Sequence, residues 1–525
     1  LTVGRVDTAS DKVGALVGPF AKGAVDLPIL VENEQDLLDN FGEPSSTDKH
    51  YEYWMTASSY LAYGGPLRIV RADDDDLKNA FSGSAGSIKI KSTEHYNDLG
   101  YDGTAITGVT VAARNPGSWA NGIKVAIIDS FADQVLTFGT LPANVQVGYG
   151  ITQAIPANTV LAGSGSTSLL SGHFKGIVTA VDATNKKLSV KILESVTSAG
   201  VATDVTYQPN GIYKFGNTAA TVHTNAGVAT GTGTPSANVD WFDSQSIALT
   251  NTTINWNNIA DRPGTSSFAA ARNSRFDEVH VVVIDDEGTV TGNAGTILEK
   301  HLSLSKAKDG EFSLGSPSYW RKYIYNNSAN IFGGSAPAGI TTTSFSSGYT
   351  LSSDVGWDQN AQGIDFAATG ATTLTLGGGK NYDGNSDATV AGSFQVTLAG
   401  LVAGYELFED NNLYSADFLL MGSGNHTKET VQSLANKLIS VAEIRKDSVA
   451  FISPNRGAFL SDGSAGTVTV YSDSQITDNV ISFYSPISSS SYAVFDSGYK
   501  YMYDRFGDTF RYVPMNGDIA GLCAR

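Results

Sequence analysis

Hydrophobic side chains recur at intervals of three and four residues in three stretches of the chain, a spacing that predicts amphipathic helices. The first helix should begin after Asn33, whose side chain can cap it, and should end at Gly42. A second helix is expected over residues 48–63 and a third over residues 427–445. The apolar stripe of the third helix is formed by Val431, Leu434, Ala435, Leu438, Ile439 and Ala442.

Short apolar runs lie on either side of these helices and predict strands. Residues 13–20 and 67–71 enclose the two early helices, which makes the opening a compact β-α-α-β piece. Residues 417–421 and 448–452 enclose the third helix. A strand, a helix and a strand of these lengths form a βαβ unit, so the last two strands should run parallel.

The middle and the end of the chain carry further strand patterns. Residues 279–284 are almost wholly apolar and predict a central strand. After it, Leu298, His301 and Leu302 predict a short helix. Near the end, aromatic residues alternate with polar ones, which predicts a hairpin with an aromatic ladder. Its two strands contain Tyr499, Tyr501, Tyr503, Phe510 and Tyr512.

Composition changes along the chain and indicates several domains. Residues 131–240 are dominated by Ala, Gly, Thr, Ser and Val with frequent turn signals, which is typical of β-rich structure. The expected fold class is multidomain α/β plus β, with a mixed α/β core assembled from both ends of the chain and a β-rich insertion domain. The expected segments are a first part of the core (1–130), an outward-facing β-rich insertion (131–240), a core continuation (241–332), a loop-rich insertion (333–372), and a core segment with the βαβ unit and the aromatic hairpin (373–525).

Charge and cysteine content narrow the possible functions. The 525-residue chain has a formal net charge of −18, and charged residues make up only 16% of it. Such an acidic surface repels phosphates, so non-specific binding to nucleic acid is not expected. No apolar run reaches the roughly 18 residues of a membrane-spanning helix. The first residues do not have the pattern of a signal peptide, and the single cysteine, Cys523, fits folding in a reducing cytoplasm.

Four consecutive carboxylates, Asp73 to Asp76, are a candidate metal site. Consecutive residues of a strand or loop point in different directions, so a solvated junction is the simpler interpretation. The seven histidines contain no pair at the i, i+4 spacing of a helical zinc site, and Cys523 has no cysteine neighbour. We therefore expect no metal, no cofactor and no catalytic residue.

Two glycine-rich segments are similar to ligand-binding loops but complete no motif. Gly422 to His426 follow a strand and open a helix, a place where anions can bind, yet a lone G-x-G is more often a tight turn. Gly377 to Lys380 lack the Ser or Thr that follows the lysine of a phosphate loop. We interpret both segments as turns.

A carbohydrate-active enzyme remains an alternative, because paired carboxyl groups and aromatic platforms are what such enzymes use. Three acids at a turn are better explained as solvated charge, and tryptophans are better explained as core residues. The residues concerned are Asp285, Asp286 and Glu287 as acids, and Trp119, Trp241 and Trp256 as platforms. Another β-rich virion surface or adhesion protein is a second alternative.

Several phrases spread over the chain carry a family resemblance when they are taken together. They are GALVGPFAKGAVDLPILVENEQDLLDNFGEP (14–44), YLAYGGPLRIVR (60–71), ARNPGSWANGIKVAI (113–127), HVVVIDDEGTVTGNAGTILEKHLSLSKAKDG (280–310), LTLGGGKNYDG (374–384) and, most specific, SSYAVFDSGYKYMYDRFGDTFRYVPMNGDIAGLCAR (490–525). In these phrases the chain resembles the tail sheath proteins of contractile-tailed bacteriophages, in the T-even-like and cyanophage branch. Two parts of the family pattern, an N-terminal arm and a C-terminal tube-proximal domain, are not found.

The resemblance implies a structural protein rather than an enzyme. Sheath subunits form hexameric rings that stack helically around the tail tube, and contraction of the stack drives the tube through the host envelope. The implied partners are other copies of the chain, the tail tube protein, the baseplate and the tail terminator, with no nucleic acid and no direct membrane insertion. The implied location is the virion tail, after synthesis in the host bacterial cytoplasm. Without the two missing parts, we expect this chain alone to be monomeric.

Overall fold

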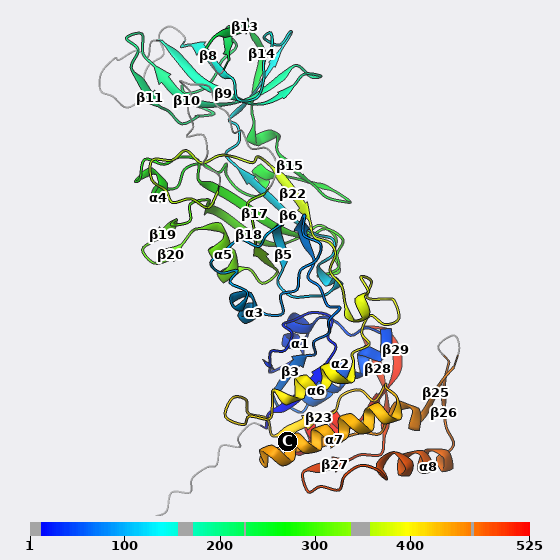
Figure 1. Cartoon of the computed structure of the whole chain (residues 1–525). Helices are drawn as coiled ribbons and strands as arrows, with labels where there is room; N and C mark the ends of the chain where they lie inside the picture. Colours follow the sequence, from blue (N-terminus) through cyan, green and yellow to red (C-terminus); the bar gives the residue numbers. More distant parts are fainter. Residues whose placement is uncertain (1–11, 156–171, 225–226, 338–356, 464–466) are drawn as a thin grey trace, which may run out of the picture.

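The computed structural model describes residues 12–155, 172–224, 227–337, 357–463 and 467–525. In it, three modules follow one another along an elongated molecule (Figure 1). We call them the lower, middle and upper modules after their places in that view. The expected segments 131–240 and 333–372 lie partly outside the described residues.

A six-stranded sheet forms the centre of the lower module and joins distant parts of the chain. Its strand order is β2-β3-β1-β23-β24-β27, and all neighbours are parallel except β2 and β3. Gly14 of β1 lies opposite Phe418 of β23. The core of the lower module is therefore built from residues that precede the middle and upper modules in the sequence and from residues that follow them. The strands are β1 (Gly14–Gly18), β2 (Ile29–Val31), β3 (Leu67–Arg71), β23 (Phe418–Leu420), β24 (Val449–Ile452) and β27 (Ala493–Phe495).

Helices cover both faces of this sheet. Successive residues of a strand point to opposite faces. Val17 packs against Gly404 of α6, whereas Gly14 and Gly18 face tyrosines of α2, so α6 and α2 lie on opposite sides. Helix α7 packs beside α6, and α9 packs beside α2. The helices are α1 (Glu34–Phe41), α2 (His50–Leu61), α6 (Leu398–Glu406), α7 (Lys428–Arg445), α8 (Asp473–Tyr484) and α9 (Asn516–Ala524).

The structure confirms the three helices that the sequence predicts. Helix α1 begins after Asn33, whose side-chain oxygen accepts a 3.0 Å hydrogen bond from the Asp36 backbone, and ends at Gly42, where φ is 78°. Helix α7 follows Thr427 as its N-cap. Strands β23 and β24 on either side of α7 are parallel, as the βαβ pattern predicts.

The predicted C-terminal hairpin is also confirmed. Strands β28 (Tyr499–Asp504) and β29 (Thr509–Pro514) pair antiparallel, with Tyr501 opposite Tyr512. The hairpin packs on α2, and next to it a smaller pair is formed by β25 (Leu460–Asp462) and β26 (Val468–Val470). The short η6 turn (Arg456–Ala458) precedes β25.

Two antiparallel sheets form the middle module. The larger has the order β18-β17-β6-β22, so the apolar run predicted as a central strand is indeed an inner strand. The smaller has the order β21-β5-β4. The larger sheet consists of β6 (Ile123–Asp129), β17 (Glu278–Asp285), β18 (Thr296–Ser305) and β22 (Thr372–Thr375), and the smaller of β4 (Phe81–Gly83), β5 (Val109–Ala113) and β21 (Ile331–Gly333).

The short helix predicted around Leu298, His301 and Leu302 is wrong, because all three residues lie in strand β18. His301 pairs with Val281 of β17, and the register shifts at two points along the pair. Pairing with a buried apolar strand therefore outweighs a helical spacing of only a few residues. The other elements of this module are α3 (Thr93–Asp98), α4 (Ser267–Ala270), α5 (Trp320–Asn327) and the hairpins β15 (Ser246–Ala248) with β16 (Thr253–Asn255) and β19 (Glu311–Ser313) with β20 (Ser316–Pro317).

The upper module is a single eight-stranded sheet that encloses its own core. Its main path is β13-β12-β8-β9-β10-β7-β14, and β11 pairs with β10 beside this path. Buried side chains such as Leu136, Phe174 and Leu188 fill its interior. The strands are β7 (Gln134–Phe138), β8 (Gly150–Ala154), β9 (His173–Asp182), β10 (Lys187–Val196), β11 (Ala202–Asp204), β12 (Ala220–His223), β13 (Ala229–Gly233) and β14 (Pro235–Asp240).

Candidate functional site

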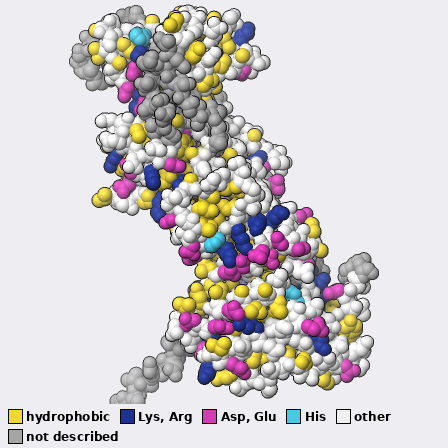
Figure 2. All heavy atoms as spheres, in the orientation of Figure 1, with side chains coloured by type: hydrophobic (Ala, Val, Ile, Leu, Met, Phe, Trp, Pro, Cys, Tyr) yellow, Lys and Arg dark blue, Asp and Glu magenta, His cyan; other side chains and the backbone are white. Residues whose placement is uncertain are grey.

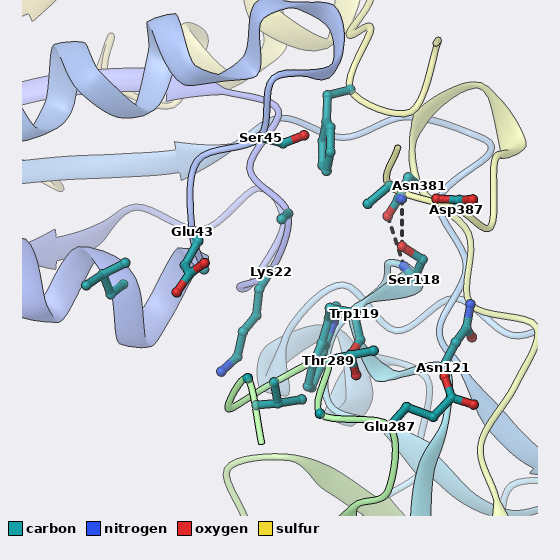
Figure 3. A pocket seen from close by; sticks show the side chains of 18 of the residues that line it. Lys22, Glu43, Ser45, Ser118, Trp119, Asn121, Glu287, Thr289, Asn381 and Asp387 are labelled. Atoms are coloured by element: carbon teal, nitrogen blue, oxygen red, sulfur yellow. Dashed lines mark hydrogen bonds between the residues drawn. The ribbon is translucent and has the colours of Figure 1, made fainter. Parts of the chain in front are cut away.

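One cavity lies where the lower and middle modules meet. It has a volume of about 820 Å³. Lys22 and Glu43 line it from the lower module, and Trp119, Asn121 and Glu287 line it from the middle module (Figure 3). Charged side chains of both signs gather around this boundary on the face shown in Figure 2. We call this cavity the inter-module cleft.

Lys22 is the most unusual charged group of the cleft. Its ammonium nitrogen lies 5.3 Å from the ring centroid of Trp119, close enough for a cation–π contact. Burial lowers the pKa of Lys22, and the nearby Asp39 carboxylate opposes that effect. The contact joins the two modules across the cleft.

Most amides and hydroxyls of the cleft are engaged within the protein. Asn121 donates to the Gly379 carbonyl (3.0 Å) and accepts from the Gly379 amide (2.8 Å). Asn381 donates to Ser118 Oγ (2.8 Å), as the dashed lines of Figure 3 show, and accepts from the Ser118 amide (2.9 Å). These side chains hold the connecting segments in place and do not converge on a common point.

The carboxylates of the cleft do not form an acid–base pair of glycosidase type. Such an acid needs a carboxyl group whose pKa is raised by burial. Asp387 shows the opposite, since hydrogen bonds from the backbone and side chain of Thr389 lower its pKa. Glu43 and Glu287 are exposed on the two facing walls. This arrangement does not favour hydrolytic chemistry.

A second cavity of about 520 Å³ is lined by Asp74, Asp76, Asp383 and His426. His426 lies 2.9 Å from the Tyr53 hydroxyl, and burial lowers its pKa. Among the described residues, no group of three His, Cys, Asp or Glu side chains is placed to hold a metal ion.

The run Asp73 to Asp76 is only partly the solvated junction that we expected. Asp75 and Asp76 are exposed. Asp73 instead forms ion pairs with Lys89 (2.7 Å) and Lys91 (2.6 Å), which lower its pKa against the opposing effect of burial. Its role is therefore structural.

The interpretation of Asp285, Asp286 and Glu287 as solvated charge is wrong for the first two, which are buried. Asp285 accepts hydrogen bonds from the Val290 and Thr291 amides (3.0 and 2.8 Å). Asp286 forms an ion pair with Lys124 (2.8 Å). Sequence reasoning missed this because the partners come from a following loop and from another strand.

Both glycine-rich segments are packed turns. Gly422 has φ 77°, and a Cβ atom there would lie 2.8 Å from the Tyr53 ring. Ser423, next to it, donates to buried Glu52 and is not free for a ligand. At Gly379, a Cβ atom would lie 2.3 Å from the Gly117 carbonyl oxygen. Close backbone approach explains these glycines.

The tryptophans divide into two kinds. Trp241 and Trp256 are buried in the hydrophobic cluster beneath the central sheet of the middle module. Trp119 is half-buried and faces the inter-module cleft, with Lys22 over its ring. Of these three tryptophans, Trp119 alone is therefore exposed enough to contact a ligand.

A group of buried and partly buried charges joins the middle and upper modules, and we call it the upper joint. Asp129 and Lys306 form a fully buried ion pair (3.0 Å). Arg262 contacts Asp240 and Asp133. Lys191 completes the group.

Lys191 of strand β10 is a buried member of this joint. Its ammonium group contacts the Ser130 carbonyl and lies 3.4 Å from the ring centroid of Phe276. Burial lowers the pKa of Lys191 to about 7, and the Asp133 carboxylate opposes that shift. Sequence reasoning gave no signal for this joint.

A second buried network ties the two ends of the described chain together in the lower module. Glu52 accepts hydrogen bonds from Arg456 (2.9 Å), Ser423 (2.7 Å) and Tyr499 (3.3 Å). Arg456 also contacts Asp462 at 2.9 Å. Burial raises the pKa of Glu52, and the guanidinium of Arg456 opposes that rise.

The search for membrane-spanning helices gave a negative result for the described residues, where no helix is long and apolar enough to cross a bilayer.

No protein-family model matches the chain, but individual proteins of known identity are similar to it over most of its length. The chain is 24% identical to a tail sheath protein of Enterobacteria phage T4 over 531 residues, which cover 98% of this chain and 70% of that protein. It is also 24% identical to a tail sheath protein of Vibrio phage KVP40, over 99% of this chain and 71% of the other. These matches span all three modules.

A solved sheath tail protein from Listeria innocua gives a weaker match. It is 8% identical, covers 96% of this chain and 68% of the other, and has a TM-score of 0.28. This score is too low to support a conclusion about the fold. The similarity of this chain to tail sheath proteins therefore rests on the sequence matches alone.

Proposed function

We infer, from the premise that the chain belongs to the tail sheath proteins of contractile-tailed bacteriophages, that it is a structural subunit of a contractile tail sheath. The observation that carries this conclusion is sequence similarity to proteins of that name over nearly the whole chain. An assembly protein of this kind works through how its copies pack. The engaged polar groups of the inter-module cleft agree with that role.

We propose that contraction uses the free-energy difference between two packings of the same subunits. If the packing of the subunits drives the movement, the assembly needs two discrete arrangements of otherwise rigid subunits. The upper joint and the Glu52–Arg456 network support this proposal, because breaking buried and paired charges is costly. Each copy would then move as one body while contacts between copies change.

The partners proposed are other copies in hexameric rings, the tail tube protein, the baseplate and the tail terminator. A net charge of −18 supports a protein partner rather than nucleic acid. The proposed location is the virion tail, after synthesis in the host cytoplasm.

We also propose that residues 131–240 form an outward-facing insertion and that the other four segments divide as the sequence suggests. The position of the upper module at the far end from the lower module supports this (Figure 1). Residues 134 and 240 lie opposite each other in paired strands, so the module enters and leaves at one point.

Antibody labelling of contractile-tailed particles tests the proposed function. An antibody raised against the upper module should place gold particles at many points along the tail. Labelling confined to capsids, tail fibres or unassembled material would contradict the assignment. An antibody against the major capsid protein serves as the control for position.

A further inference from the structure

Two neighbouring stretches of chain connect the upper module to the middle module. The chain enters after β6 and leaves after β14, and we call the two stretches, residues 129–134 and 240–242, the neck. The upper module continues the long axis of the molecule beyond the neck (Figure 1). Two modules joined in this way are expected to move relative to each other unless further contacts hold them. Contacts beside the neck therefore decide the angle between them.

Phe276 of the middle module reaches into the upper module beside the neck. It packs with Ile177 of β9 and Leu193 of β10 in a small apolar cluster, which is separate from the cores of the two modules. Phe276 is only 6% exposed, and both of its apolar partners in this cluster belong to the upper module. We call Phe276 the peg, and Ile177 with Leu193 the socket.

Two long cations, one from each module, flank the peg. The Lys191 ammonium of the upper module lies 3.4 Å from the centroid of the Phe276 ring, and the Arg275 guanidinium of the middle module lies 4.6 Å from it. Both distances are within the range of a cation–π contact. Arg275 also donates to the Leu193 and Val205 carbonyls of the upper module, at 3.3 and 2.6 Å. Each module thus contributes one cation to the seat of the peg.

The backbone of the peg is strained. Its φ of 65° lies in the left-handed region, which bulky residues rarely adopt. The Phe276 amide donates to Thr265 Oγ1, and its carbonyl accepts from the buried Lys306 ammonium, both at 3.0 Å. Strain of this kind persists only where the surrounding contacts outweigh it, and it gathers at clamps and switches. The middle module therefore holds a costly conformation that directs this ring into the socket.

We propose that Phe276 is a latch: while its ring is seated between Ile177 and Leu193 the upper module keeps one angle to the middle module, and when the ring is withdrawn the upper module turns about the neck with both modules still folded. Withdrawal empties a small cluster and leaves both larger cores intact. Arg262 pairs with carboxylates of the neck itself, so these ion pairs do not depend on the peg.

The latch goes beyond the proposed sheath function, since it is a property of the single chain. A seated peg makes the upper module move together with the rest of the subunit. Its release relieves the strained backbone, which lowers the cost of freeing the upper module below the cost of unfolding it. The joint therefore adds a discrete state in which the upper module is free.

Single-molecule FRET on the purified 525-residue chain tests the latch. One dye is attached at Thr184→Cys, in the exposed turn between β9 and β10, and the other at Leu314→Cys, a 99% exposed residue between β19 and β20. Cys523→Ser removes the single native thiol. The parent should show one transfer efficiency. Phe276→Ala should populate a second one, because truncation of a buried phenylalanine shifts such an equilibrium about a hundredfold or more.

Two further variants separate the latch from a general loss of stability. Leu193→Ala weakens the socket from the other module and should populate the same second efficiency. Phe312→Ala truncates a 49% exposed aromatic residue of the middle module and should leave the single efficiency unchanged. Circular dichroism should show that all three variants keep their secondary structure.

An unchanged single efficiency in Phe276→Ala would overturn the proposal, because the peg would then not set the angle. Loss of secondary structure in both Phe276→Ala and Leu193→Ala would also overturn it, because the peg would then belong to the folding core. Neither result depends on where antibodies label the tails, so failure of the latch and failure of the sheath assignment are distinguishable.

Discussion

Replacement of Glu52 by alanine should destabilise the lower module by about 3–5 kcal/mol, the usual cost of removing one partner from a buried ion pair. The carboxylate is fully buried and accepts hydrogen bonds from Arg456, Ser423 and Tyr499. Each hydroxyl that loses its acceptor costs about 1 kcal/mol, and the remaining loss comes from the unpaired guanidinium and the small cavity. Asp462 keeps one contact to Arg456, which favours the lower end of the range.

Chemical denaturation followed by circular dichroism gives the loss in unfolding free energy, and hydrogen exchange of β23 assigns it to the lower module. Glu32→Ala, at an exposed position, is the matched control and should change stability by less than about 0.5 kcal/mol. The double variant Glu52→Leu with Arg456→Met should recover part of the loss, because no unpaired charge remains in the core and Asp462, which loses its partner Arg456, is 38% exposed to solvent. A loss below about 1 kcal/mol for Glu52→Ala would refute the reasoning.

Three further predictions concern a buried aspartate, a glycine with positive φ, and the segment 131–240. Burial raises the pKa of Asp496 from 3.8 to about 6, so the folded state binds this proton more tightly and the unfolding free energy should fall as pH rises through that window. Asp496→Asn should therefore stabilise the protein at pH 8 by about 1–3 kcal/mol and flatten this pH dependence; an unchanged pH profile would contradict the assignment. Gly422→Ala should lower the unfolding free energy, measured by thermal unfolding, by about 2–4 kcal/mol, because a positive φ and a close tyrosine ring both disfavour a side chain there. Gly64→Ala, which has a positive φ but open space around it, should lower the unfolding free energy by about 1 kcal/mol. Equal losses in the two variants would show that the tyrosine ring contributes nothing. Deletion of residues 131–240 with a short Gly/Ser linker should leave the other two modules folded by circular dichroism, at a loss of a few kcal/mol from exposure of Phe276; loss of helical signal would refute it.

The parts of the fold that sequence predicts well are those in which local signals agree. Asn33 and Gly42 bound a helix whose apolar spacing is regular, and the βαβ unit combines two apolar runs with an eighteen-residue amphipathic helix. Such elements need no knowledge of distant partners. Strand β18 could not be predicted, since its residues are polar and apolar in no clear period and are fixed by pairing with β17.

The candidate site also depends on contacts between residues that are distant in the sequence, so the sequence did not predict it. The inter-module cleft brings together Lys22, Trp119 and Glu287, which are far apart in sequence, and no local motif marks them. The sequence predicts Asp285 and Asp286 as solvated turn residues, yet both are buried, Asp285 with partners in the following loop and Asp286 with Lys124 of another strand. The aromatic ladder was predictable as alternation, but its exposure depends on which face of the hairpin meets the lower module.

The central claim is that copies of one nearly rigid subunit adopt two packings in a contractile tail sheath. Cryo-electron microscopy of the tails before and after contraction tests it most directly. We predict that the three modules fit both density maps as one body, repeated around the tube, and that only contacts between copies change. Density that lacks this fold along the tail, or modules that must be refolded to fit one of the two maps, would contradict the account.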